Sequence, residues 1–370
     1  MTRILAATLA FFCLVGITPA VAARPVTDCP LRDAPFSANS PLIDLLLSPA
    51  ARHVVEKELA TSFDHMPDRF IGTKAPTFAA ILTLHEAAGF LHAGPDAVAR
   101  ADAALRRLPV TATDRIARCE RYDNEAPRFV QPRGKPRLLL FEKINGFKDV
   151  PGFDAAHAMF FELAHRNGWS IVATDKGGAL NPATLRQFDA VIWNNISGDV
   201  LTLAQRRAFR DYIEHGGGYV AVHGSAGDPV YFWNWYVDGL LGARFAGHPI
   251  ARQFQDARVV VDDRASPIAR GLPGEWVMND EWYSFKNNPR ASGAHVVARL
   301  DESTYAPDGM AGQNLRMGDH PIAWNRCVGR GKMFYSAIGH RPESYSRPEY
   351  RTMLTNAIIW ATRPGSCRGK

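Results

Sequence analysis

The sequence has no long run of like charge and no internal repeat, and each absence excludes a class of protein. Lysine and arginine total 43 against 37 aspartate and glutamate, so the formal net charge of +6 is small for 370 residues. A charge of this size without a basic cluster does not make a nucleic-acid-binding surface. Without a repeat, a solenoid or propeller is not expected. We therefore expect no nucleic-acid partner.

Long apolar runs are also missing, apart from one at the N-terminus. Residues 1–23 combine a charged start at Arg3, an apolar stretch over 4–17 and a small-residue segment over 19–23. This is the pattern of a secretory signal peptide, and a retained N-terminal anchor is the alternative. No later run reaches the roughly 20 residues that a bilayer span needs. We expect a secreted or periplasmic protein with no membrane span after signal cleavage.

Only five cysteines occur, and Cys13 lies inside the predicted signal peptide. The other four lack CxxC spacing, which argues against a cysteine-built metal or redox site. An even number of cysteines in an oxidising compartment predicts disulfides, and four cysteines allow three pairings. We favour Cys29 with Cys119 and Cys327 with Cys367, because each pair then closes one region of the chain.

Hydrophobic residues make up 46% of the chain, which is enough for a core, and the length favours one large domain with an appendage. Apolar residues at spacings of three and four predict a small helical domain over residues 24–124. Within it we expect one helix over 77–92 and another over 96–108. Residues 125–136, rich in proline and charged residues, predict a linker.

From residue 137 the pattern becomes that of an α/β domain, predicted over 137–363 and followed by a tail over 364–370. Apolar runs alternate with amphipathic helices, which predicts a mostly parallel sheet with helices on both faces. The expected strands are 138–141, 169–174, 189–195 and 219–222, then shorter ones near 257–261, 294–300, 321–325 and 332–336. Three helices are expected. One covers 153–167, a second begins at a capping box formed by Thr202 and Gln205, and a third covers 346–361 and begins at a capping box formed by Ser346 and Glu349.

Ligands of such sheets bind at the carboxyl ends of the strands, so functional residues are expected there. The strand over 219–222 ends in a tight small-residue turn at His223 and Gly224, which resembles a nucleophile elbow with histidine in the raised position. This histidine can act as a base, an electrophile or a metal ligand. Glutamine amidotransferase or peptidase activity is not expected, because no cysteine lies near the elbow.

Residues 137–361 resemble the ThuA-like (trehalose utilisation) family. The matching segments are 216–223, 241–245 with 247–249, 280–283, and 329–335 with 339–340. The resemblance implies a flavodoxin-like fold of the class I glutamine amidotransferase type without the catalytic cysteine, and a role around sugars such as keto-disaccharides. One departure is that Lys148 and Asp149 stand where the family usually has Arg-His, so a family histidine is lost here or replaced by Asp149.

Three histidines and one carboxylate are the candidate catalytic residues: His223, His248, His340 and Glu281. Neighbouring residues of an extended segment point to opposite faces, so only one of Asp280 and Glu281 should face the site; we favour Glu281, with Tyr283 on the same side. The same four residues are candidate ligands of a divalent metal ion. An acid-base cluster without metal, or purely structural histidines, are the alternatives.

The remaining candidates would bind substrate. The aromatic run over 231–236 predicts core packing, with Trp233 or Tyr236 as the residues most able to stack on a sugar ring. The candidate substrate-binding residues are Asn145, Lys148, Asp149, Asn195, Asp228, Trp233, Tyr236, Asp280 and Tyr283. We expect an enzyme that acts on a small-molecule sugar or keto-glycoside by hydrolysis, elimination or isomerisation, with His223 as base. The alternative is a non-catalytic carbohydrate-binding or sensory module.

Overall fold

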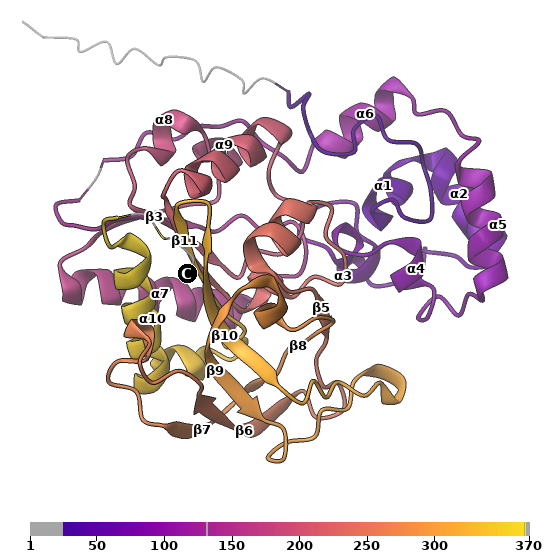
Figure 1. Ribbon diagram of the computed structural model, residues 1–370. Coiled ribbons are helices and arrows are strands. Elements are labelled where there is room, and N and C mark those ends of the chain that lie inside the picture. The colour runs from indigo at the N-terminus through magenta and orange to yellow at the C-terminus, as the bar shows by residue number, and fades with distance from the viewer. Residues whose placement is uncertain (1–24, 131, 366, 368–370) are drawn as a thin grey trace, which may run out of the picture.

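The computed structural model describes residues 25–130, 132–365 and 367; the predicted signal peptide and most of the predicted tail lie outside these residues. A helical domain with its own buried core lies beside a larger α/β domain (Figure 1). The helical domain contains α1 (Leu42–Leu47), α2 (Pro49–Leu59), α3 (Asp68–Ile71), η1 (Phe78–Ala80), α4 (Leu84–Ala87), α5 (Pro95–Leu105) and α6 (Ala112–Cys119).

The stretch 77–92, expected as one helix, forms only the short elements η1 and α4. Between them the carbonyl of Leu82 accepts a hydrogen bond from the N–H of Leu42, and the N–H of Leu84 donates to the carbonyl of Ala38. Backbone groups that bond to another segment are not free to continue a helix. Thr83 then begins α4 with a capping box. The helix prediction is wrong here because long-range backbone pairing overrides the local apolar spacing.

The α/β domain is built on a nine-stranded sheet in the order β2-β1-β3-β4-β11-β10-β9-β6-β7. The first five strands run parallel, and the last four continue the sheet in antiparallel pairs. Their bounds are β1 (Arg137–Phe141), β2 (Ser170–Thr174), β3 (Ala190–Asn194), β4 (Gly218–Val222), β6 (Phe254–Val261), β7 (Glu275–Glu281), β9 (His295–Asp301), β10 (His320–Val328) and β11 (Gly331–Ser336). The strands β5 (Phe245–Gly247) and β8 (Ser284–Phe285) form a separate pair.

Helices cover both faces of the parallel strands, as expected. Figure 1 shows α8 (Pro182–Leu185) and α9 (Leu203–Glu214) on one side, and α7 (Val150–Asn167) and α10 (Pro348–Thr362) on the other. The capping box at Thr202 is present. The one expected at Ser346 is absent: Pro342–Ser346 forms the turn η8, and α10 begins at Pro348 after Arg347, whose side chain makes no cap. The α/β fold with a mostly parallel core is confirmed.

Both expected disulfides are present, Cys29–Cys119 and Cys327–Cys367. The first joins the start of the described chain to the end of α6 and so closes the helical domain. The second ties residue 367, which follows α10, to β10. In the part of the chain that the structure describes, no helix has the length and apolar character of a membrane span.

Candidate active and metal site

His223 is the first residue after β4, and its backbone has a φ of 37°, in the left-handed region. A non-glycine residue there costs on the order of 1–3 kcal/mol, so the surrounding structure must hold it. Its Nδ1 lies 2.8 Å from the carbonyl oxygen of Ala337. Because a carbonyl only accepts, Nδ1 carries the hydrogen, and in the neutral ring Nε2 presents a lone pair on the opposite side.

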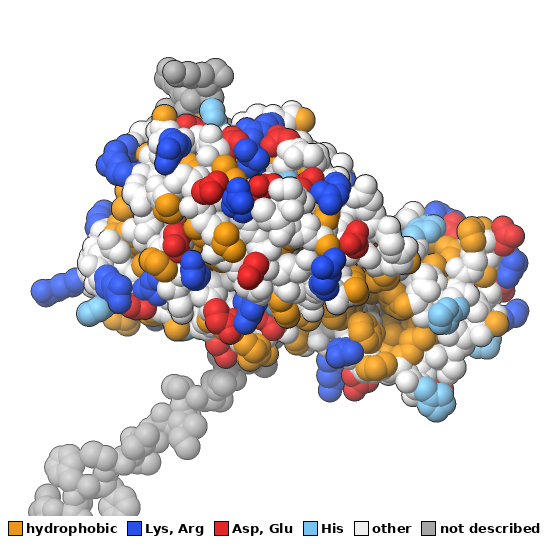
Figure 2. All heavy atoms as spheres, turned by 90° about the horizontal axis from the view of Figure 1, so that it is seen from below, with side chains coloured by type: hydrophobic (Ala, Val, Ile, Leu, Met, Phe, Trp, Pro, Cys, Tyr) orange, Lys and Arg blue, Asp and Glu red, His pale blue; other side chains and the backbone are white. Residues whose placement is uncertain are grey.

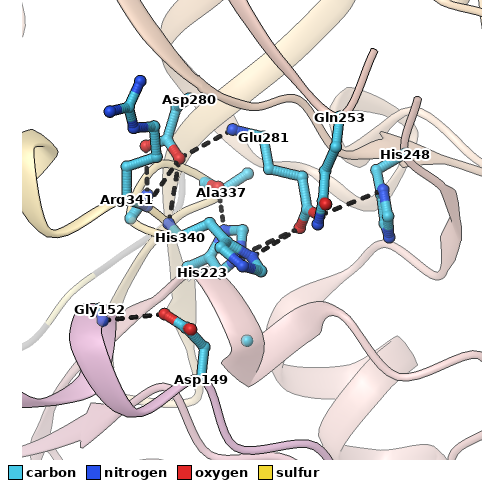
Figure 3. Close-up of polar contacts among 12 residues, drawn as sticks. Asp149, Gly152, His223, His248, Gln253, Asp280, Glu281, Ala337, His340 and Arg341 are labelled. Atoms are coloured by element: carbon cyan, nitrogen blue, oxygen red, sulfur yellow. Dashed lines mark hydrogen bonds and ion pairs between the residues drawn. The ribbon is translucent and has the colours of Figure 1, made fainter. Parts of the chain in front are cut away.

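Nε2 of His223 faces side-chain atoms of His340 and Glu281, so atoms from three different strand ends form a triangle (Figure 3). Nε2 of His223 is 3.1 Å from Nδ1 of His340 and 3.3 Å from Oε2 of Glu281. Nδ1 of His340 is 3.0 Å from the same Oε2. Among the described residues these three form a group that could hold a metal ion. His340 follows β11 and Glu281 ends β7, so the cluster exists only in the folded sheet.

The three atoms have too few hydrogens to satisfy one another. In the neutral ring Nε2 of His223 is an acceptor, the ionised Glu281 only accepts, and His340 can place a single hydrogen between them. Although burial opposes ionisation, the rings of His223 and His340 beside it hold the pKa of Glu281 well below its usual range. Burial lowers the pKa of His340, but its hydrogen bond with Glu281 outweighs this and raises it. The cluster is therefore a site for a positive charge.

Asp280 points away from this triangle, as the alternation of an extended segment predicts, but it fixes one of its members in place. Its carboxylate lies beneath the loop that carries His340, and this loop surrounds it with donors. It accepts hydrogen bonds from the N–H groups of Gly339 (2.8 Å), His340 (3.1 Å) and Arg341 (3.2 Å) and from the hydroxyl of Ser344 (2.7 Å). The two neighbouring acids therefore have different roles. Glu281 contacts the histidine rings, and Asp280 holds the backbone of the loop that carries His340.

The second oxygen of Glu281 is also occupied. Oε1 accepts from Nε2 of Gln253 at 2.6 Å and lies 3.2 Å from Nδ1 of His248. Nδ1 of His248 is also 2.9 Å from the carbonyl of Pro249, so it is the protonated nitrogen, and Nε2 lies on the far side of the ring (Figure 3). The side chain of Glu281 is 2% exposed, whereas His340 and His248 are 11% and 24% exposed. A ligand would therefore reach the site past these two histidines.

Several expected substrate-binding residues lie beside the cluster. The ring of Tyr283 stacks on His223 with 4.2 Å between ring centroids. Asp149 caps α7 through the N–H of Gly152, and its charge contributes to the raised pKa of His340. Asn195 accepts from the N–H of Gly224 and so supports the turn after β4.

Other expected residues have contacts that bind the fold together. The amide of Asn145 donates to the carbonyls of Arg121 and Asp199, and Lys148 lies over the ring of Phe153. Tyr236 belongs to η4 (Trp235–Leu241) and packs in the core with its hydroxyl donating to the carbonyl of Ser225, while Trp233 stacks beside it. Asp228 is buried against Ser197 and Gly198. The core interpretation of the aromatic run agrees with these contacts.

Sequence reasoning missed four contributors to the site: Gln253, the carbonyl of Ala337, and the rings of Phe147 and Phe254. Both rings contact His340, with centroids 6.0 Å away for Phe147 and 5.2 Å away for Phe254. Phe147 lies in the segment that departs from the family pattern, and this was a usable signal. A backbone carbonyl and a single glutamine before β6 carry no signal in one sequence.

The structure thus has a covered, mostly parallel α/β sheet with histidines and a carboxylate at the carboxyl ends of its strands, and no cysteine at the turn after β4. The chain belongs to the ThuA family, because the family model described as trehalose utilisation matches residues 137–361. The resemblance noted from the sequence is confirmed. The helical domain lies outside the match.

A solved structure agrees with this assignment. A ThuA-like protein from Bacteroides uniformis shares 26% identity over 64% of this chain and 95% of its own, with a TM-score of 0.54. Two others match more weakly. A ThuA-like protein from Parabacteroides merdae is 15% identical over 63% and 92%, with a TM-score of 0.47, and a GMP synthase protein from Thermoplasma acidophilum is 15% identical over 60% and 92%, with a TM-score of 0.36. No protein with a curated description matches the chain.

The buried carboxyl of Asp228 makes stability depend on pH. Burial raises the pKa of Asp228 to about 7, although hydrogen bonds from Ser197 and Gly198 oppose the rise. An acid that stays protonated in the folded chain and ionises in the unfolded chain weakens the fold as pH rises from about 4 to about 7. A pKa shift of about three units corresponds to a loss on the order of 4 kcal/mol in the free energy of unfolding.

We expect urea unfolding to show that the free energy of unfolding falls between about pH 4 and pH 7. Asp228→Asn, which resembles the protonated acid, should reduce this fall. Asp211→Asn, a change at an exposed acid, is the control and should retain the fall. The same pH dependence in Asp228→Asn and the wild type would show that Asp228 is ionised in the fold.

Proposed function

We propose that this protein is an exported enzyme that acts on a sugar or keto-glycoside with a divalent metal ion held by His223, Glu281 and His340. The triangle of nitrogen and oxygen atoms separated by 3.0 to 3.3 Å carries the proposal. Ligand atoms at neighbouring positions of an ion, with bonds of about 2.1 Å, lie about 3.0 to 3.4 Å apart. The observed separations fall in this interval without any rearrangement of the side chains.

The partners of the three residues support a metal site. Metal-binding histidines commonly donate their other ring nitrogen to a carbonyl, which fixes the tautomer, and His223 does so to Ala337. Gln253 orients Glu281. Two nitrogens and one carboxylate oxygen are typical of sites that keep positions open for water or substrate.

The chemistry follows from what surrounds the open side. A divalent ion there would polarise an oxygen of the bound sugar. In this proposal His223 holds the ion, so the general base is His248 and not His223; Nδ1 of His248 is hydrogen-bonded, its Nε2 faces away from Glu281, and Glu281 orients the ring. Removal of a proton next to the carbonyl of a keto-sugar would give elimination or isomerisation. The family's description as trehalose utilisation supports a sugar as substrate.

The metal is tested by elemental analysis of protein purified without chelators. We expect about one transition-metal ion per chain, reduced at least tenfold in His223→Ala and in Glu281→Gln because each removes one of three ligands. His295→Ala, a change at an exposed histidine in β9, is the control and should retain the ion. A wild type that stays metal-free after incubation with zinc or manganese would contradict the metal and leave the His340–Glu281 pair as an acid-base couple.

The activity is tested on a panel of disaccharides and simple glycosides in their unoxidised and keto forms. We expect turnover by the wild type, at least a hundredfold loss in Glu281→Gln and His248→Ala, and unchanged thermal unfolding in His248→Ala, because its ring is partly exposed. Equal turnover in all proteins would contradict the assignment. Saturable binding without turnover would favour the carbohydrate-binding or sensory module, to which the changed Lys148 and Asp149 also point.

Export rests on the sequence of residues 1–23 and on the two disulfides, which persist in oxidising compartments. We expect the mature protein from expression in a Gram-negative host to be in the periplasmic fraction, with its N-terminus close to residue 24 by mass spectrometry. Full-length protein that remains with the membranes would support the retained anchor, and full-length protein in the cytoplasm would contradict export.

A further inference from the structure

Two phenylalanine rings beside the site are exposed to solvent. Phe147 and Phe254 lie next to His340, and they are 37% and 42% exposed. Phenylalanine has no polar group to satisfy in water, so two such rings beside one histidine form an apolar rim at the side from which a ligand would enter.

The rim continues into the helical domain. Phe147 contacts Phe78 of η1 with 5.0 Å between ring centroids, and Phe78 contacts Phe70 of α3 at 5.4 Å. Phe78 and Phe70 are themselves only partly buried. Figure 2 shows hydrophobic side chains gathered in the hollow where the smaller lobe meets the larger one. We name the rings of Phe147, Phe78 and Phe70 the aromatic row; it leads away from His340 into a domain that the family model does not include.

We propose that the aromatic row binds the second ring of a disaccharide whose first ring lies at the His223–Glu281–His340 cluster. The inference rests on the proposed function and gives its substrate a size: two sugar rings. A pyranose presents C–H groups on its ring faces, which pack on aromatic side chains, and hydroxyl groups around its rim, which need polar partners.

Polar partners are present at the row and beside Phe254. The guanidinium of Arg69 lies 4.7 Å from the ring centroid of Phe70, and that of Arg341 lies 5.7 Å from that of Phe254. Each offers several N–H donors to sugar hydroxyls. The row thus combines apolar surface with donors at its Phe70 end, and Arg341 adds donors beside Phe254, the other exposed ring next to His340. This combination suits a neutral sugar better than a lipid or an apolar peptide segment.

The experiment is calorimetric titration of the metal-loaded protein with trehalose and with methyl α-glucoside, each in its unoxidised and its keto form. We expect Phe78→Ala to weaken binding of the disaccharide about 3- to 10-fold, the equivalent of one lost aromatic contact. Binding of the one-ring glycoside and the metal content should stay within about twofold of the wild type, because Phe78 does not contact the cluster.

Phe90→Ala is the matched control, since Phe90 is a 41% exposed phenylalanine of the same domain outside the row. We expect it to bind both sugars as the wild type does. Phe78→Trp, which keeps an aromatic ring, should retain binding of the disaccharide, and Phe70→Ala tests the row again if Phe78→Ala fails to fold.

The outcomes separate the inference from the function on which it rests. If the wild type binds both sugars and Phe78→Ala and Phe70→Ala bind them equally well, the row only joins the two domains and the inference is overturned, while the proposed function stands. If no sugar binds to metal-loaded wild type, the proposed function itself fails, and the inference with it.

Discussion

The two adjacent carboxylates at the end of β7 are the feature on which the site depends. Glu281 contacts histidines from two other strand ends, and Asp280 holds the backbone of the loop that carries His340. Four strands lie between β4 and β7 in the sheet order, yet His223, which follows β4, contacts Glu281, the last residue of β7. Because strands in a sheet are about 4.8 Å apart, this contact requires the sheet to curve so that the end of β7 lies near the end of β4.

Burial gives this arrangement its chemical character. A carboxylate that is 2% exposed is costly unless positive or hydrogen-donating groups surround it. Around Glu281 those groups are the rings of His223, His340 and His248 and the amide of Gln253. Even so, the triangle of His223, His340 and Glu281 has fewer hydrogens than acceptors. His223 has a left-handed backbone at the end of β4, and with it the ring contacts both Ala337 and Glu281.

Much of the fold could be predicted because its signals are local. The apolar runs of β1, β3 and β4, the capping box of α9 and the change of pattern near residue 137 depend on neighbours in sequence. The two errors have different causes, one in backbone pairing between distant segments and one in a local turn. Residues 82–84 bond to residues 38–42 in place of forming a helix, and a turn before α10 replaces the expected cap at Ser346.

For the site, the sequence by itself determined which residues follow strand ends, which acid of the Asp280–Glu281 pair faces the cluster, and the absence of a cysteine nucleophile. These properties follow from strand alternation and from chain order alone. Only the tertiary structure decided that His223, His340 and Glu281 meet, that Ala337 and Gln253 orient them, and that the helical domain brings Phe78 against Phe147. The reason is that sheet curvature and domain contact depend on packing among residues far apart in the chain, and one sequence carries no local trace of them.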